Sequence, residues 1–330
     1  MEALLKVKNL SIDIRRAEQY LNSVKDISFE IYPGEILGIV GESGSGKSLT
    51  ALSIPGLLGE NREVSAGSIL FREGEEGSGY LNLLELPEKE LQAIRGKEIS
   101  MVFQEPFSSL NPLVKIGKQI TETLEIHGEK NKARINEQVK QVLQELKLDN
   151  PEKLMKAYPH HLSGGMCQRV MIAIAIICRP RLLIADEITT ALDQNTQTQI
   201  IAFIKKINRD FGTAVLFISH DLSLVRNFCD RVLVMYSGRL LEEGNAEDVF
   251  LHPAHEYSRN LLDAIPGRAN RGKDLASIPG KIPSLEEGRP PGCPFHPRCS
   301  KASPLCVGEF PPLREIGANH KTHCVIPEGK

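Results

Sequence analysis

The sequence predicts an α/β protein built on a phosphate-binding strand–loop–helix unit, and three observations lead to this prediction. Residues 41–48 read GESGSGKS and fit the pattern G-x-x-x-x-G-K-[S/T]. A second apolar run, 182–187, ends in two acids. Beyond about residue 178 strands alternate with helices, which indicates a largely parallel sheet. We also expect an antiparallel β subdomain, an inserted helical subdomain and a cysteine-containing C-terminal extension.

The phosphate-binding loop has the surroundings that its motif requires. An apolar run, 36–40, predicts a buried strand before it, and residues 49–54 can start a helix after it. Glycines allow backbone N–H groups to point at phosphates, and the helix N-terminus adds its positive dipole end. We expect Lys47 to reach the β- and γ-phosphates of a nucleotide and Ser48 to bind Mg²⁺. A chance glycine turn is the alternative. The expected nucleotide-binding residues are Gly41, Glu42, Ser43, Gly44, Ser45, Gly46, Lys47, Ser48 and Leu49.

Composition and charge are those of an ordinary globular protein. The chain has 330 residues, of which 25% are charged and 41% apolar, and its net charge is −2. We therefore expect no nucleic-acid partner. The N-terminus lacks the basic start and long apolar core of a signal peptide. The longest apolar run, 170–178, is about half of a membrane span, so we expect a cytosolic chain that does not cross a bilayer.

The remaining elements follow from periodicity and propensity. The first hundred residues predict mostly strands, over 4–14, 26–32, 69–71 and 98–104. Helices follow over 116–127, 133–148 and 151–157, which predicts a helical insert at about 105–178 in a nucleotide-binding domain over 1–250. The later elements are helices over 166–178, 196–211 and 221–228, and strands over 181–187, 214–219, 231–236 and 239–243. Eleven of the 20 prolines lie from 266 to 327, so we expect a loop-like extension within 251–330.

Two acids at the end of the second apolar run carry a catalytic prediction. Asp186 is placed to hold Mg²⁺ through water, and Glu187 to orient and deprotonate an attacking water. Two ordinary acids at a strand end are the alternative.

The segment LSGGMCQR at 162–169, together with the phosphate loop, resembles the signature of ATP-binding-cassette (ABC) ATPases. Further pieces of that family follow in order: Gln104 resembles the glutamine loop, Ala191-Leu192-Asp193 the loop that crosses a dimer interface, and His220 the switch histidine. The resemblance covers about 4–250. It implies a P-loop (RecA-like) ABC ATPase core that binds ATP and Mg²⁺, the metal through Ser48, Gln104 and Asp186. It also implies catalysis by Glu187 and His220.

The resemblance further implies a head-to-tail dimer of two ATPase subunits. In it, the partner's ATP is contacted by Ser163, Gly164, Gly165 and Asp193. Two departures from the family pattern stand out. Ile188 occupies the place of a usual proline, and Ile14 the place of the adenine-stacking aromatic. Tyr20 is the nearest aromatic residue and is either the adenine platform or an ordinary surface tyrosine.

Three segments resemble the dipeptide and oligopeptide importer branch of the family: 97–104, 107–112 and the tail segment 288–299. The resemblance implies an ATPase subunit at the cytoplasmic face of the membrane that energises uptake of di- or oligopeptides. Its expected partners are a second ABC ATPase, often a paralogue, two transmembrane permease subunits and, indirectly, an extracytoplasmic solute-binding protein. A nickel or metal-chelate importer is the nearest alternative, and a soluble cassette ATPase or a small-molecule kinase is more remote.

Four cysteines crowd the tail with the spacing C-x5-C-x6-C-x17-C: Cys293, Cys299, Cys306 and Cys324. In a cytosolic chain this pattern indicates a metal site before a disulfide set. The resemblance implies a [4Fe–4S] cluster. Zinc, with His296, His320 or His323 as substitute ligands, and free thiols remain alternatives.

Overall fold

The computed structural model describes residues 2–74, 77–189, 193–264 and 278–325. It divides into two compact units. The first comprises 1–31, 36–84 and 218–330, and the second comprises 32–35 and 85–217. These two units are defined by compactness and are not the domains expected from the sequence. The domain boundary at residue 250 and the insert at about 105–178 therefore stay predictions.

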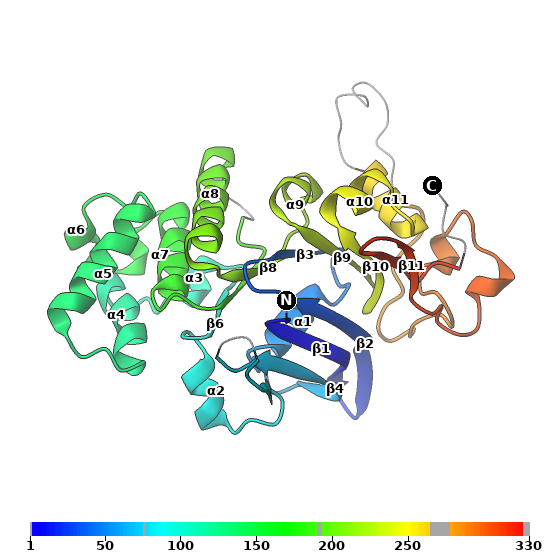
Figure 1. Ribbon diagram of the computed structural model, residues 1–330, viewed down its shortest axis with the longest axis horizontal. Helices are drawn as coiled ribbons and strands as arrows, with labels where there is room; N and C mark the ends of the chain where they lie inside the picture. The colour runs from blue at the N-terminus through cyan, green and yellow to red at the C-terminus, as the bar shows by residue number, and fades with distance from the viewer. Residues whose placement is uncertain (1, 75–76, 190–192, 265–277, 326–330) are drawn as a thin grey trace. The chain divides into compact units, whose positions relative to one another are not determined.

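The first unit contains an antiparallel sheet with the strand order β2-β1-β4-β5 (Figure 1). The strands are β1 (Leu5–Arg16), β2 (Gln19–Ile31), β4 (Arg62–Arg72) and β5 (Tyr80–Asn82). A tight hairpin joins β1 to β2, since Arg16 is paired with Gln19. Val7, Leu10 and Ile12 of β1 are buried. The structure thus contains the antiparallel region that the sequence predicts.

The second sheet of this unit carries the strand that precedes the phosphate loop, β3 (Ile36–Val40), all of whose residues are buried. It is paired in parallel with β9 (Arg231–Tyr236), which is paired antiparallel with β10 (Arg239–Asn245). Two tail strands extend this sheet beyond β10: β12 (His320–Thr322) and β11 (Arg314–Gly317). The prolines predict a loop-like tail, but residues 313–322 contain none, so this part of the tail can form a hairpin.

The α-helices in the described part of the first unit are short: α1 (Lys47–Ser53), α9 (Leu222–Phe228), α10 (Ala246–Leu251) and α11 (Glu256–Asp263). A buried carboxylate, Glu242 of β10, connects the tail to this region. It accepts hydrogen bonds from the backbone N–H groups of Ala254 and His255 at 2.8 and 2.9 Å. It also lies 2.7 Å from Nε2 of His320 in β12. These donors compensate the loss of water around the buried charge.

The second unit holds three strands in the order β8-β7-β6. They are β6 (Ile99–Val102), β7 (Leu182–Asp186) and β8 (Ala214–Ile218), and β6 is parallel to β7. Its helices are α2 (Glu88–Ile94), α3 (Pro106–Ser109), α4 (Ile116–Ile126), α5 (Lys132–Glu145), α6 (Pro151–Met155), α7 (Gly164–Ile176) and α8 (Gln194–Phe211).

Helices α4 to α7 form the helical region that the periodicity predicts (Figure 1). Val139 and Leu143 of α5 are fully buried, as are Ile116 and Ile120 of α4. Close packing explains one glycine here, because a Cβ at Gly117 would lie 2.8 Å from the Met155 backbone oxygen. Among the described residues, no helix is long and apolar enough to cross a membrane.

Candidate functional site

The phosphate loop lies between β3 and α1 in the first unit, and its backbone requires glycine. Gly41, Gly44 and Gly46 have φ values of 149°, 80° and 100°, which side chains disfavour. A Cβ at Gly41 would lie 2.1 Å from the backbone oxygen of Met235. The three glycines of the motif are therefore needed for the backbone conformation of the loop.

Lys47 begins α1 and turns its ammonium group back into the loop. Its side chain is 5% exposed. Nζ donates to the backbone oxygens of Gly41 and Glu42 at 2.8 and 3.0 Å, and lies 3.5 Å from Ser45 Oγ. The Lys47 ammonium group thus lies inside the loop that the sequence predicts to bind nucleotide phosphates.

The first half of the loop has partners that the sequence did not indicate. The Glu42 backbone N–H donates to the hydroxyl of Tyr257, in α11, at 2.8 Å. The Glu42 carboxylate accepts a hydrogen bond from Arg298, in the C-terminal extension, at 2.9 Å. Burial raises the pKa of Tyr257 well above its usual value, so its hydroxyl stays protonated. No local sequence pattern marks Tyr257 or Arg298.

The predicted catalytic acids lie in the second unit, at the end of the buried strand β7. Asp186 is its last residue and is 6% exposed. Glu187 follows with φ 49°, a left-handed conformation that is uncommon for a residue with a side chain. Gln104 Nε2 donates to Glu187 Oε2 at 2.9 Å. The structure therefore brings Gln104 and Glu187 together. The next residue, Ile188, stands in the place of the usual proline and is buried.

The signature segment forms the N-terminus of α7. Ser163 is the N-cap, and its Oγ accepts a hydrogen bond from the Met166 N–H at 3.3 Å. A Cβ at Gly164 or Gly165 would meet its nearest neighbours at 3.6 Å, an ordinary contact. Internal packing thus does not demand these two glycines. Their predicted contact with the partner's ATP at the positive end of the helix stays a prediction.

Asp193 is the N-cap of α8, also in the second unit. Its carboxylate accepts hydrogen bonds from the Thr196 N–H at 2.9 Å and the Thr196 hydroxyl at 2.6 Å. Both hydrogen bonds lower the pKa of Asp193, and the one from the Thr196 hydroxyl contributes more than the one from the Thr196 N–H. Ala191 and Leu192, which precede it in the predicted interface loop, lie outside the described residues. His220 follows β8 and is exposed.

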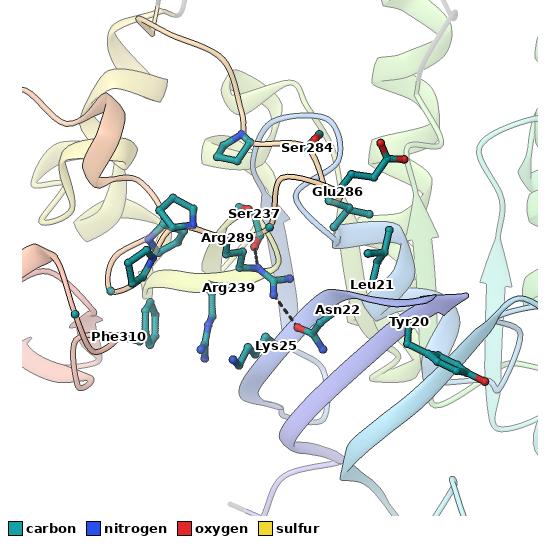
Figure 2. A pocket seen from close by; sticks show the side chains of 18 residues that line it. Tyr20, Leu21, Asn22, Lys25, Ser237, Arg239, Ser284, Glu286, Arg289 and Phe310 are labelled. Carbon is teal, nitrogen blue, oxygen red and sulfur yellow. Dashed lines mark hydrogen bonds between the residues drawn. The ribbon is translucent and has the colours of Figure 1, made fainter. Parts of the chain in front are cut away.

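Tyr20, the candidate adenine platform, lies on β2 and is 54% exposed. It lines a cavity of about 500 Å³ together with tail residues that include Arg289. Figure 2 shows Arg289 bonded to Asn22 and Ser237, with the Tyr20 ring at the margin and pointing away from them. The role of Tyr20 stays a prediction.

The four tail cysteines are brought together although 17 residues separate the third from the fourth. All four line one cavity, which lies in the first unit: Cys293, Cys299, Cys306 and Cys324, with His255, His296 and His323. The loops that carry them pack tightly, since the Cys293 N–H donates to the Cys306 oxygen at 2.9 Å. Within the described ranges, no group of three or more His, Cys, Asp or Glu side chains is arranged to hold a single metal ion.

Burial shifts the pKa values of two side chains that line this cavity, Cys293 and His255. It raises the pKa of Cys293 to about 12, and the other three cysteines add to the shift. Burial also lowers the pKa of His255 to about 4, so this residue is neutral near pH 7. The His255 Nδ1 accepts the Tyr257 N–H at 3.0 Å, which leaves the proton on Nε2, 3.6 Å from Cys293 Sγ.

Two histidines have environments that the local sequence does not indicate. His255 is 2% exposed because it caps α11 next to the tail. His320 was a candidate zinc ligand, but it is not among the residues lining the cysteine cavity and is paired with Glu242 instead. A long-range contact of this kind leaves no trace in local spacing.

Comparisons with known proteins agree with this geometry. Residues 24–190 match the ABC transporter family, and residues 241–306 match the family "Oligopeptide/dipeptide transporter, C-terminal region". The oligopeptide transport ATP-binding protein OppD of Escherichia coli (strain K12) is 46% identical over 326 residues, covering 99% of this chain and 94% of that protein. The dipeptide transport ATP-binding protein DppD of Bacillus subtilis (strain 168) is 40% identical over 329 residues, covering 99% and 96%.

Among solved structures, the dimeric post-hydrolysis state of the ATP-binding cassette MJ0796, bound to ADP and Pi, is similar with a TM-score of 0.64 and 27% identity. The match covers 73% of this chain and 98% of that one. The predicted fold class, a P-loop ABC ATPase core, is confirmed. The chain belongs to the ABC transporter ATPases, in the branch that carries the oligopeptide/dipeptide transporter C-terminal region.

Proposed function

We propose that this chain is the ATP-hydrolysing subunit of an importer for di- or oligopeptides. The observation that carries the proposal is identity of 40–46% to oligopeptide and dipeptide transport ATP-binding proteins over 99% of the chain, tail included. A nickel or metal-chelate importer of the same branch is the second candidate.

In this proposal, residues 41–49 bind the phosphates of ATP, and Lys47 offsets their charge. Ser48, Gln104 and Asp186 hold Mg²⁺. Glu187 orients the water that attacks the γ-phosphate in line, and His220 contacts that phosphate. The hydrogen bond from Gln104 to Glu187 supports the assignment, because it fixes the carboxylate that must hold the water. Phosphoryl transfer of this kind depends mainly on positioning and electrostatics.

The proposed assembly is a peripheral subunit at the cytoplasmic face of the membrane. Its partners are a second ABC ATPase, often a paralogue in this branch, two permease subunits and, indirectly, a solute-binding protein. ATP held between two ATPase subunits would join them, and hydrolysis would release them, which makes a ligand-driven switch.

The test is reconstitution of the chain with its permease and ATPase partners in lipid vesicles. Peptide-loaded binding protein is expected to stimulate ATP hydrolysis and drive peptide uptake into the vesicles. Stimulation by a nickel chelate, with no response to peptides of two to five residues, would favour the second candidate.

A substitution in the signature segment is expected to affect the ATP of the partner subunit and not the ATP bound by this chain. Replacing Ser163 by Arg places a bulky cation at the N-terminus of α7, so we expect hydrolysis at the partner's site to fall about 100-fold. ATP binding to this chain's own phosphate loop should change less than about twofold, because the proposal assigns Ser163 to the partner's ATP. Binding to the single chain is measured by calorimetry, and turnover in the assembled transporter. Equal loss of both would contradict the assignment.

We propose further that Cys293, Cys299, Cys306 and Cys324 hold a [4Fe–4S] cluster. Four thiols lining one cavity are a suitable donor set, and cations would stabilise thiolates at Cys293 and Cys299, where burial disfavours them. Each cysteine of such a cluster ligates its own iron, whereas zinc requires ligands converging on one point. The cluster would cross-link a proline-rich extension that has little core of its own.

Anaerobic purification is expected to give brown protein with broad visible absorbance and about four iron atoms per chain. Cys306→Ser should lose most of the colour and iron, because one ligand is missing. Cys178→Ser removes a thiol outside the cavity and should keep both. A colourless preparation with stoichiometric zinc would establish the zinc alternative instead.

A further inference from the structure

Arg298, in the C-terminal extension, forms a bidentate ion pair with Glu42, the second residue of the phosphate loop. Nη1 donates to Glu42 Oε2 at 2.9 Å, and Nη2 donates to Oε1 at 3.3 Å. The Arg298 side chain is 6% exposed and the Glu42 side chain 24%. This geometry suits a guanidinium group, and a lysine does not reproduce it.

The guanidinium is itself held in place by three other acceptors. Nε donates to the Pro279 oxygen at 2.7 Å, Nη1 to the Tyr236 hydroxyl at 3.2 Å and Nη2 to the Ile278 oxygen at 3.3 Å. Exposed ion pairs contribute little because both side chains are free to move. Arg298 is buried and fixed, so it can act as a rigid support for Glu42.

The backbone of Glu42 is held by the same part of the molecule. Its N–H donates to the Tyr257 hydroxyl at 2.8 Å. The rings of Tyr257 and Tyr236 are 4.7 Å apart, and the ring of Phe295, in the extension, lies 5.2 Å from Tyr257 and 5.3 Å from Tyr236. Both the side chain and the backbone of Glu42 thus depend on an aromatic cluster that the extension completes.

We propose that Arg298 is a positioning residue for ATP binding, which neutralises Glu42 and holds the first half of the phosphate loop in its phosphate-accepting shape. The inference rests on the proposed assignment of residues 41–48 to the phosphates of ATP. Without Arg298, the half-buried Glu42 carboxylate carries an uncompensated negative charge in a loop that must bind a polyanion. ATP affinity then depends on the C-terminal extension.

Calorimetric titration of the full-length chain with Mg-ATP tests this inference. Arg298→Met is expected to raise the Kd for ATP about tenfold, because the unpaired carboxylate repels the phosphates. Glu42→Gln alone removes the carboxylate that Arg298 neutralises but keeps the backbone N–H that donates to Tyr257, so its Kd should rise less than that of Arg298→Met. The combined variant should recover most of the lost affinity, because no unpaired charge remains. A merely structural contact would not be rescued by removing its partner's charge.

Arg289→Met provides the matched control. Arg289 is a half-buried arginine of the extension, and it donates hydrogen bonds to Asn22 and Ser23 rather than to the loop. Adding Glu42→Gln to Arg289→Met should restore no affinity. Arg298→Lys keeps the charge and loses the bidentate geometry, so an intermediate Kd is expected. This variant carries the test if thermal unfolding shows that Arg298→Met does not fold.

Two results would overturn the inference: a Kd for Arg298→Met equal to that of the unmodified chain, or no recovery in the combined variant. Lys47→Ala separates this failure from failure of the proposed function. If Lys47→Ala weakens ATP binding and Arg298→Met does not, only the role of Arg298 is lost. If neither does, the assignment of the loop is wrong.

Discussion

Glu187→Gln is expected to lower ATP turnover of the assembled transporter about 1,000-fold, the largest effect that we predict for a single substitution. An amide of the same size can still accept the hydrogen bond from Gln104 Nε2 but cannot take a proton from water. ATP binding should therefore stay within about threefold of the unmodified protein. Turnover is measured by phosphate release in vesicles, and binding by calorimetry.

The same substitution should trap the ATP-bound pair of ATPase subunits, because the hydrolysis that separates them is blocked. Chemical cross-linking in Mg-ATP is expected to show the pair accumulating. Glu125→Gln, at an exposed position of α4, removes the same charge elsewhere in the unit and should leave turnover unchanged. Turnover of Glu187→Gln equal to that of Glu125→Gln would remove Glu187 from its catalytic role.

Lys47→Ala is expected to act on nucleotide binding itself. The substitution removes an ammonium group that the structure holds at 2.8 Å from the Gly41 oxygen, inside the loop. Losing one charge-assisted contact to phosphate should raise the Kd for ATP by about 10- to 100-fold. Calorimetry on the full-length chain measures this directly.

Lys8→Ala is the matched control, since Lys8 is an exposed lysine of β1 in the same unit. It should bind ATP like the unmodified protein. Because α1 begins at Lys47, thermal unfolding must show that Lys47→Ala keeps its fold. Unchanged ATP affinity in a folded Lys47→Ala protein would contradict the phosphate-loop assignment.

Most regular elements could be predicted from the sequence because their signals are local. The strand before the phosphate loop is a short apolar run, and the structure places it at Ile36–Val40 as expected. The helix expected from 166 starts two residues earlier, at Gly164, because Ser163 caps it. The tail hairpin, β11 and β12, was missed because overall proline content hides a proline-free stretch within the tail.

The chemistry of the site divides in the same way. Local sequence alone predicted the roles of Lys47, Asp186 and Glu187, since patterns of this kind are recognised within a few residues. The contact between Gln104 and Glu187 spans 83 positions, and only the fold could reveal it. The buried His255 was also missed, because a histidine carries no hydrophobic signal that predicts burial.

The sequence by itself predicted a phosphate loop, an ABC signature and a catalytic acid for this chain, because each prediction depends on residues that are neighbours along the backbone. Only the tertiary structure decided that four distant cysteines share one cavity and that Arg298 binds Glu42, 256 positions away. The reason is physical. Local backbone conformation follows from short-range sterics and periodicity, whereas a buried ion pair forms only where packing removes both partners from water.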